Sequence, residues 1–231
     1  VGLDKLLHTM GGNFGDLDGD GWLDFYVGTG DPSLGTLIPS RMFRNDSGRG
    51  FQEVTTSGGF GQLQKGHGIA FADLNHDGAQ DVYSVVGGAF SGDHYPNQLF
   101  ANPGHGNRWL RLRLEGVETN RAALGARIKV VVDTAGGERS IHRVVSSGGS
   151  FGASPPGQDN GLGAAGAIGG VEIFWPRAGR TQVLSGIVLD RAYHVREDGN
   201  EAEEVAGPSF AWPSAGGDTR HSHGHGSAHH H

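Results

Sequence analysis

The sequence contains no cysteine among its 231 residues, and it also lacks a long hydrophobic run. The missing cysteine excludes a disulfide framework, a thiolate metal site and a cysteine nucleophile, but it does not define a cellular compartment. No segment approaches the ~18 consecutive apolar residues of a membrane span, and no basic and then apolar leader starts at Val1. We therefore expect no membrane span, in a chain that is mature, trimmed or excerpted.

Basic residues are scarce in the first part of the chain. Residues 1–106 carry 5 Lys/Arg against 12 Asp/Glu, residues 107–197 carry 12 against 8, and residues 198–231 carry 1 against 5. The resulting charges of these three parts are -7, +4 and -4. The basic middle part has neither an aromatic stacking platform nor a recognised binding motif, so we do not expect nucleic acid as a partner.

Glycine, in contrast, is abundant. The 43 glycines show no collagen period and are interleaved with β-branched and aromatic residues. This composition predicts many short strands joined by tight turns, and therefore an all-β protein.

An internal repeat organises the first 106 residues. The segment FGDLDGDGWLDFY at 14–26 recurs as FADLNHDGAQDVY at 71–83, and the same offset of 57 carries MFRN at 42–45 onto LFAN at 99–102. Each unit begins with a strand that enters an acidic loop. The further strands that we expect are 24–29, 41–45 and 51–55 in the first unit, and 81–86, 98–101 and 109–114 in the second.

Four strands per unit are typical of a propeller blade. A closed propeller needs about four to eight blades, so two blades form only an incomplete propeller. Unpaired strand edges are prone to aggregation. We therefore expect missing upstream blades, the second domain or a neighbouring subunit to cover the edges.

From Asn107 the pattern changes to alternating strands, of which WLRLRLEG is the clearest. This pattern predicts a small β-sandwich or barrel over residues 107–197, and the composition of residues 198–231 predicts a disordered, extended, His-rich tail. The further strands expected in the second domain are 127–133, 139–145, 170–175, 181–186 and 192–197.

The two acidic loops share the pattern D-x-[DN]-x-[DN]-G-x-x-D. Positions one, three and five converge on one point when the chain curls, and a glycine at position six permits the sharp turn. Position seven would add a backbone carbonyl, by analogy with other curled calcium loops. The candidate metal ligands are Asp16, Asp18, Asp20, Trp22 and Asp24 in the first loop, and Asp73, Asn75, Asp77, Ala79 and Asp81 in the second.

A set of ligands that contains only oxygen and is rich in carboxylates selects a hard cation. Ca²⁺ accepts about six to eight oxygens in flexible geometry, whereas Mg²⁺ demands a tighter octahedron and Zn²⁺ prefers nitrogen or sulfur. The loops are not EF-hands, because the ninth position is an aspartate that begins a strand and no glutamate stands at position twelve. The sequence therefore predicts two calcium sites.

Both loops resemble the calcium loops of FG-GAP/VCBS repeat propellers, as in integrin α-subunit heads and many secreted bacterial proteins. The segments that resemble an ASPIC/UnbV domain, as in cartilage-acidic-protein-like extracellular proteins, are TNRAALGARI at 119–128, SSGGSFGAS at 146–154, GLG at 161–163 and VEIFWP at 171–176. The chain departs from this pattern at Asp159-Asn160, where the family tends to show His-Phe, and in having only two repeats.

We therefore expect a secreted or cell-surface protein that is not an enzyme and whose calcium ions brace the β repeats in adhesion, matrix or surface assembly. Its expected partner is a protein or a carbohydrate at the cell surface. The alternative is a subunit of an extracellular filament, assembled through the unclosed blade edges and the C-terminal tail.

Two weaker signals remain. GGSFG at 148–152 fits the G-x-S-x-G pattern of a hydrolase with Ser150 as nucleophile, but two prolines and two glycines follow where that site needs a helix. Histidine nitrogens in the tail could chelate Zn²⁺, Cu²⁺ or Ni²⁺, unless they belong to a low-complexity end or a purification tag. These histidines are His221, His223, His225, His229, His230 and His231.

Overall fold

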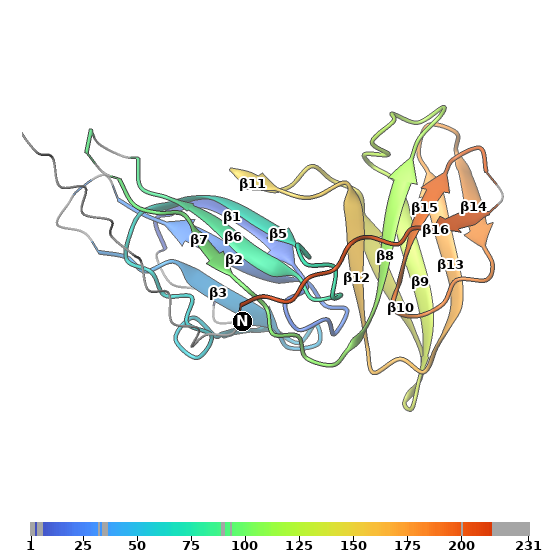
Figure 1. The fold of residues 1–231 in the computed structure, drawn as a ribbon, viewed down its shortest axis with the longest axis horizontal. Helices are drawn as coiled ribbons and strands as arrows, with labels where there is room; N and C mark the ends of the chain where they lie inside the picture. Colours follow the sequence, from blue (N-terminus) through green and yellow to red (C-terminus); the bar gives the residue numbers. More distant parts are fainter. Residues whose placement is uncertain are drawn as a thin grey trace, which may run out of the picture.

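The computed structural model describes residues 3, 7–31, 33, 37–88, 91–92, 94–199 and 201–213. In this part of the chain sixteen strands form four sheets of four strands each, and there is no helix. The all-β prediction is therefore confirmed. The strands lie in two lobes, a pair of blades and a sandwich, which stand side by side in Figure 1.

Blade 1 is an antiparallel sheet with the strand order β1-β2-β3-β4. Its strands are β1 (Thr9–Gly15), β2 (Asp24–Thr29), β3 (Arg41–Asn45) and β4 (Phe51–Glu53). All four lie where the repeat predicts them. Phe14 is paired with Phe25, and Phe25 is paired with Phe43, so these three rings form a row across one face of the sheet.

Blade 2 repeats the first three of these strands and then departs from the pattern. Its sheet has the order β11-β5-β6-β7, and the short strand β11 runs parallel to β5. The strands are β5 (Gly66–Ala72), β6 (Asp81–Val86), β7 (Gln98–Phe100) and β11 (Gly152–Ala153). The fourth strand therefore comes from the second half of the chain.

The prediction that residues 109–114 form the fourth strand of blade 2 is wrong. These residues belong to β8 (Arg108–Glu115), which lies in the sandwich between β12 and β15. The reason is the alternation of the segment, because Leu110, Leu112 and Leu114 are all buried in the core of the sandwich.

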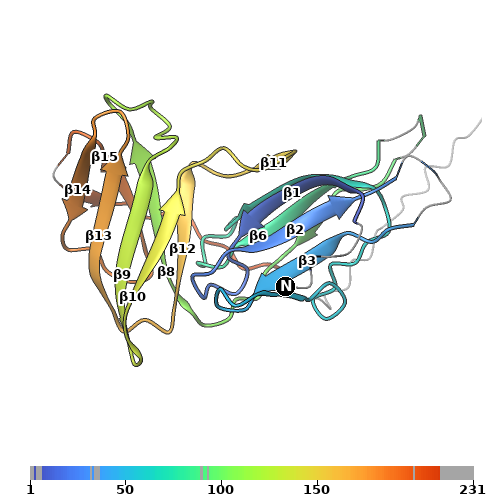
Figure 2. The same ribbon diagram turned by 180° about the vertical axis from the view of Figure 1, so that it is seen from behind.

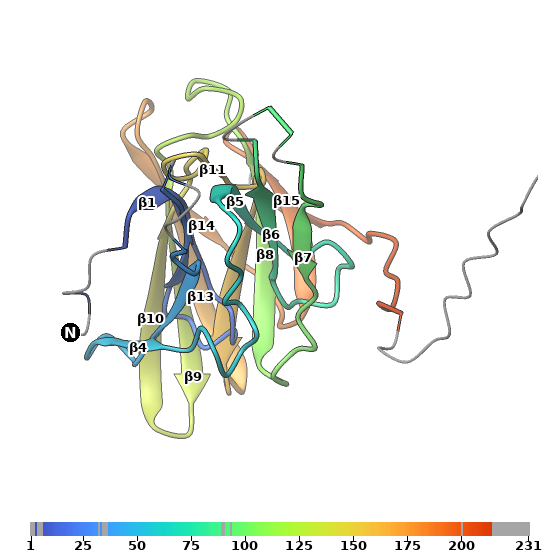
Figure 3. The same cartoon turned by 90° about the vertical axis from the view of Figure 1, so that its left-hand side faces the viewer.

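The two blades pack face to face, as Figure 3 shows in the view along the molecule. Tyr26 and Met42 of blade 1 form one buried cluster with Ile69, Phe71 and Val82 of blade 2, together with Phe60 from the following loop. The ring of Phe71 packs directly on Gly15, where an added Cβ atom would lie 2.1 Å from that ring. A side chain at this position would displace Phe71 from the contact.

The second lobe is a β-sandwich rather than a barrel. One sheet has the order β10-β9-β13-β14 and the other has the order β12-β8-β15-β16. Figure 2 shows this lobe from behind. The strands not yet named are β9 (Arg127–Thr134), β10 (Gly137–Val144), β12 (Gly157–Gly163), β13 (Ala167–Trp175), β14 (Arg180–Leu184), β15 (Arg191–Arg196) and β16 (Ala202–Glu204).

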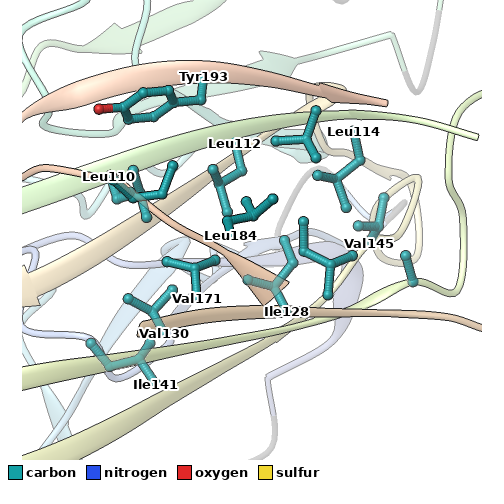
Figure 4. Close-up of a cluster of buried hydrophobic side chains, with 14 of the residues drawn as sticks. Leu110, Leu112, Leu114, Ile128, Val130, Ile141, Val145, Val171, Leu184 and Tyr193 are labelled. Atoms are coloured by element: carbon teal, nitrogen blue, oxygen red, sulfur yellow. The ribbon is translucent and has the colours of Figure 1, made fainter. Parts of the chain in front are cut away.

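Inward-facing side chains of both sheets fill the sandwich core. Leu112 comes from one sheet, and Val130 and Val171 come from the other; they meet between the layers in Figure 4. Each alternates along its strand with exposed or half-buried neighbours, which is the pattern of a sheet with one buried face. This lobe therefore has a core of its own.

The prediction of a disordered tail from residue 198 needs a correction. β16 pairs with β15 in an antiparallel arrangement, and the backbone N–H of Phe210 donates to the carbonyl of Asn75 at 3.4 Å. Residues 201–213 thus follow the sandwich and reach blade 2. The six histidines at 221–231 lie outside the described residues.

Candidate metal centres in the paired acidic loops

The two acidic loops join equivalent strands and have the same backbone shape. Loop 1 (residues 16–23) connects β1 to β2, and loop 2 (residues 73–80) connects β5 to β6. At the sixth position, Gly21 and Gly78 both have φ of +92°. Only glycine adopts this region without strain, so the glycine in the motif is a requirement of the loop geometry.

Loop 1 curls around the carboxylates at its first and ninth positions. Oδ2 of Asp16 accepts the backbone N–H of Gly21 at 3.0 Å. The two carboxylate oxygens of Asp24 accept the backbone N–H groups of Leu17 and Asn45, both at 2.7 Å. These bonds hold both carboxylates in the interior and tie the loop to β3.

Three of the predicted ligands in loop 1 meet at one point. Asp16, Asp18 and Asp24 each offer an oxygen within 4.8 Å of the others. Oδ1 of Asp16 is buried and has no hydrogen-bond partner. A buried carboxylate oxygen without a partner is costly, and a cation bound at this point would supply the missing contact.

Burial also perturbs the acid–base behaviour of loop 1. Burial raises the pKa of Asp16 to about 6, although the nearby Arg143 opposes this shift, and it raises the pKa of Asp24 to about 7. Asp20 stands outside the group of three. Its Oδ1 accepts the backbone N–H of Trp22 at 2.8 Å, and its pKa is also raised by burial.

Loop 2 repeats these contacts. Oδ2 of Asp73 accepts the N–H of Gly78 at 2.9 Å, and Asp81 accepts the N–H groups of Leu74 at 3.1 Å and Asn102 at 2.8 Å. Burial raises the pKa values of Asp73 and Asp81. The agreement with loop 1, position by position, shows that both loops are built to one plan.

The third position of loop 2 also carries a buried oxygen without a partner. The side-chain amide of Asn75 donates to Oδ2 of Asp77 at 2.7 Å, and its Oδ1 is buried without a hydrogen-bond partner. Oδ1 of Asp77 accepts the backbone N–H of Ala79 at 2.9 Å. An amide oxygen is a suitable Ca²⁺ ligand, so the asparagine preserves the donor set with one charge fewer.

The two loops are bonded to each other. Oε1 of Gln80 in loop 2 accepts the backbone N–H of Asp16 at 2.7 Å. The side-chain amide of Asn102, which follows β7, bridges the loops by donating to the carbonyls of Leu17 at 2.7 Å and Gln80 at 3.0 Å. A change in one loop therefore acts directly on the backbone of the other.

The sequence did not predict that arginine side chains of the sandwich contact both acidic loops. From β10, the Arg143 guanidinium donates to Oδ2 of Asp16 at 3.0 Å and to the carbonyl of Gly21 at 3.2 Å. From β8, Arg111 forms an ion pair with Asp73 at 3.0 Å. In each blade, the carboxylate at position one is thus paired with a mostly buried arginine of the sandwich.

Further bonds support these arginines. Nε of Arg111 pairs with Asp159 at 2.5 Å, and a guanidinium nitrogen of Arg139 donates to the carbonyl of Asp20 at 2.6 Å. Asp159 is thereby part of the contact between the lobes, at a position where the sequence departs from the family pattern. The opposite charges of residues 1–106 and 107–197 were the sequence signal for this contact.

The donor set fits a hard cation at both loops. In loop 1 the oxygens at positions one, three and nine converge. In each loop one buried oxygen at a ligand position lacks a hydrogen-bond partner, and no nitrogen or sulfur ligand enters the pattern. Carboxylate oxygens have more than one lone pair, so those that accept backbone N–H groups can also bind a metal. Ligation by the carbonyls of Trp22 and Ala79 stays a prediction.

The G-x-S-x-G segment has a structural role. Residues 146–154 leave the sandwich and lie along the blades, where the carbonyl of Ser150 accepts the N–H of Gly12 at 2.9 Å. β11 follows Ser150 in the place where a nucleophile elbow needs a helix. We name residues 146–154 the arm, because they join the sandwich to β1 and β5.

Comparison with known families agrees with this architecture. Residues 16–84 match the family model of an FG-GAP-like repeat. Residues 116–202 match the family model described as ASPIC and UnbV. A comparison with curated proteins finds no match to the chain.

Proposed function

We propose that this chain, which contains an FG-GAP-like repeat followed by an ASPIC and UnbV domain, is a calcium-binding structural or adhesion protein. Proteins with FG-GAP-like repeats are typically extracellular or at the cell surface, and the two domains together suggest that location. Within the described residues, no helix is long and apolar enough to cross a membrane.

The observation that carries the proposal is the duplicated loop with an incompletely bonded interior. Asp16 Oδ1 and Asn75 Oδ1 are buried at ligand positions and lack hydrogen-bond partners. A bound calcium ion supplies positive charge and ligand contacts at these points. The side chains of Asp16, Asp18, Asp24 and their counterparts in loop 2 would hold it.

The residues around each loop spread the effect of binding. Asp24 connects loop 1 to β3 through the N–H of Asn45, Gln80 connects the loops to each other, and Arg143 connects loop 1 to the sandwich. Fixing the loop carboxylates would therefore stiffen both blades and their contact with the second domain. A braced surface of this kind suits recognition of a protein or carbohydrate at the cell exterior.

We assign no catalytic role to Ser150. Its exposed side chain lies in a turn whose backbone bonds to β1, and the segment that follows enters β11. A non-enzymatic role agrees with the placement of the acidic residues, which bond locally to loop backbone. A broad hydrolase screen with turnover that disappears in Ser150→Ala would contradict this part of the proposal.

Thermal melting tests the proposal. The chain with excess calcium should melt several degrees higher than the same chain with a chelator, because ligand binding to the folded state raises its stability. The double variant Asp16→Asn and Asp73→Asn should lose most of this difference. The exposed Glu138→Gln in β10 serves as a matched control and should retain it. An unchanged melting temperature in calcium and chelator would refute the proposal.

A further inference from the structure

The blades expose one apolar face at each end of their stack. The outer face of blade 1 carries Phe14, Phe25 and Phe43, and we name it the front face. The outer face of blade 2 carries Tyr83, Val85 and Leu99, and we name it the rear face. Figure 3 shows the two blades side by side between these faces.

The contact inside the chain defines how one blade packs on the next. Tyr26 and Met42 of blade 1, which are paired across neighbouring strands, pack on Phe71 and Val82 of blade 2. Phe100 completes the row in blade 2, with its ring 6.0 Å from that of Tyr26. Tyr26 and Met42 are 0% exposed, and Phe71 and Val82 are 1% exposed.

The repeat places the same two rows of side chains on the outer faces. The offset of 57 relates Tyr26 to Tyr83 and Met42 to Leu99, so the rear face repeats the blade 1 side of the internal contact. The same offset relates the front-face residues to the blade 2 side of that contact, in the pairs Phe14 and Phe71, Phe25 and Val82, and Phe43 and Phe100.

Strand register confirms that the rows are equivalent. Phe14 is paired with Phe25 and Phe25 with Phe43, as Phe71 is with Val82 and Val82 with Phe100. Tyr83 is paired with Leu99 as Tyr26 is with Met42. The front and rear faces therefore repeat the two sides of an interface that the chain already forms within itself.

These outer rows are open at Phe14, Leu99 and Tyr83, whereas Phe43 is 1% exposed and its ring stacks on that of Phe25 at 4.7 Å. Phe14 is 57% exposed, Leu99 is 41% exposed and Tyr83 is 38% exposed. On the front face, the rings of Phe14 and Phe25 are 5.6 Å apart and those of Phe25 and Phe51 are 4.9 Å apart. A continuous aromatic row with an exposed end is typical of an interaction surface.

We propose that the chain associates head to tail with a second copy of itself, with the front face of one copy packed on the rear face of the next. The internal interface supplies the model for this contact, because side chains at the equivalent strand positions pack on each other there. On the rear face, Ala72 and Val85 stand where blade 1 has Gly15 and Gly28. Since the two faces differ, the contact is heterologous and can continue to a ring or a filament. The proposal does not depend on calcium in the loops.

This arrangement differs from assembly through blade edges and the tail. β4 and β7 are the terminal strands of their sheets, and edge pairing would join these strands through backbone hydrogen bonds. The residues that repeat the positions of the internal contact, however, are on the faces. The side chains of Phe14 and Tyr83 are therefore the ones to change.

Analytical ultracentrifugation of the 231-residue chain over a concentration series tests the proposal. The unmodified chain should form species larger than a dimer as concentration rises. Phe14→Asp places a charge in the front face and Tyr83→Asp places a charge in the rear face. Each variant has lost one of the two contact surfaces and should sediment alone as a monomer. An equimolar mixture should form a heterodimer, because one intact front face and one intact rear face remain, and it should form nothing larger.

Controls separate assembly from folding. Val183→Asp changes an exposed apolar residue on β14 of the sandwich and should assemble like the unmodified chain. Leu99→Arg is a second change in the rear face and should match Tyr83→Asp, and circular dichroism and melting should show that all variants remain folded. A chain that stays monomeric at every concentration would overturn the proposal. Wild-type assembly by either single variant would also overturn it.

Discussion

Asp16 is one of two blade carboxylates that form an ion pair with an arginine of the sandwich. Its Oδ2 accepts bonds from Gly21 and Arg143, and its Oδ1 has no partner. The arginine alone therefore leaves one oxygen unsatisfied. In our account the cation and Arg143 contact different oxygens of the same buried carboxylate, and each compensates part of its charge.

Replacement of Arg143 by methionine should make the protein depend more strongly on calcium. In chelator, the change leaves Asp16 as an uncompensated buried charge and should cost about 3–5 kcal/mol, the usual penalty for breaking a buried pair. In calcium the loss should be smaller, because the cation still neutralises the carboxylate. Urea unfolding in both conditions measures this difference. Arg177→Met, at an exposed position, is the matched control; equal losses of stability with and without calcium in the Arg143 variant would contradict the account.

The stability of the metal-free protein should fall as pH rises from about 4 to about 7. The pKa values of Asp16 and Asp24 are raised by burial from 3.8 to about 6 and about 7, so the folded state binds more protons than the unfolded state in this interval. The stabilisation is complete below the unfolded pKa and is lost as pH passes the folded pKa. Unfolding in chelator at a series of pH values tests this.

Saturating calcium should flatten the same profile, since the bound cation favours the ionised carboxylates. Stability in chelator that rises between pH 4 and pH 7 would show that the two carboxylates are not protonated in the folded protein.

At the scale of elements, the repeat predicted the blades well because two signals agreed. The periodic apolar residues predicted strands, and the offset of 57 predicted the boundaries of β2 and β3 in the first unit and of β6 in the second. The candidate loop ligands were predicted from the same comparison of the two units. A single residue such as Asp18 or Asn75 would not by itself have indicated a metal site. The sandwich strand β9 was equally clear from its alternation.

Elements held by distant contacts escaped prediction. β12 has the sequence GQDNGLG, which is typical of a turn, and it becomes a strand because β8 pairs with it and Asn160 bonds to the carbonyl of Leu110. β11 exists through its pairing with β5. The arginine contacts escaped for a related reason, since only the folded topology shows that Arg143 faces Asp16 and not solvent.

Gly78→Ala should impair loop 2 selectively. Its φ of +92° is unfavourable for alanine, by roughly 1–2 kcal/mol, and the added Cβ would lie 2.1 Å from the ring of Trp109. We expect a lower melting temperature and weakened calcium binding at one of two sites, measured by calorimetry. Gly50→Ala has no atom within 4 Å of the new Cβ and no positive φ, so it should leave both unchanged. Full binding in Gly78→Ala would refute the role given to this glycine.

At the scale of the whole molecule, two lobes with separate hydrophobic cores are linked by ion pairs between acidic loops and arginines. The sandwich has a large apolar core that includes Trp175, whereas the blades share a smaller cluster around Tyr26. The lobes are linked by β11 pairing with β5 and by Arg111 and Arg143 reaching the acidic loops. The loops therefore belong both to the blades and to the contact between domains.

Calcium removal should uncouple the unfolding of the two lobes. Differential scanning calorimetry should show one main transition in calcium and two in chelator, with the blades unfolding first. The sandwich, which keeps its own core, should unfold near its original temperature. A single transition in chelator, at the temperature observed in calcium, would contradict the coupling of the loops to the contact between domains.

The most direct test of the central claim is isothermal titration calorimetry of the chelator-stripped chain with CaCl₂. The paired loops predict two calcium ions per chain, and they predict one for Asp16→Asn and one for Asp73→Asn. Glu138→Gln should retain two. Absence of calcium binding by the folded, unmodified chain, or two bound ions in the double aspartate variant, would contradict the assignment of the two acidic loops as calcium sites.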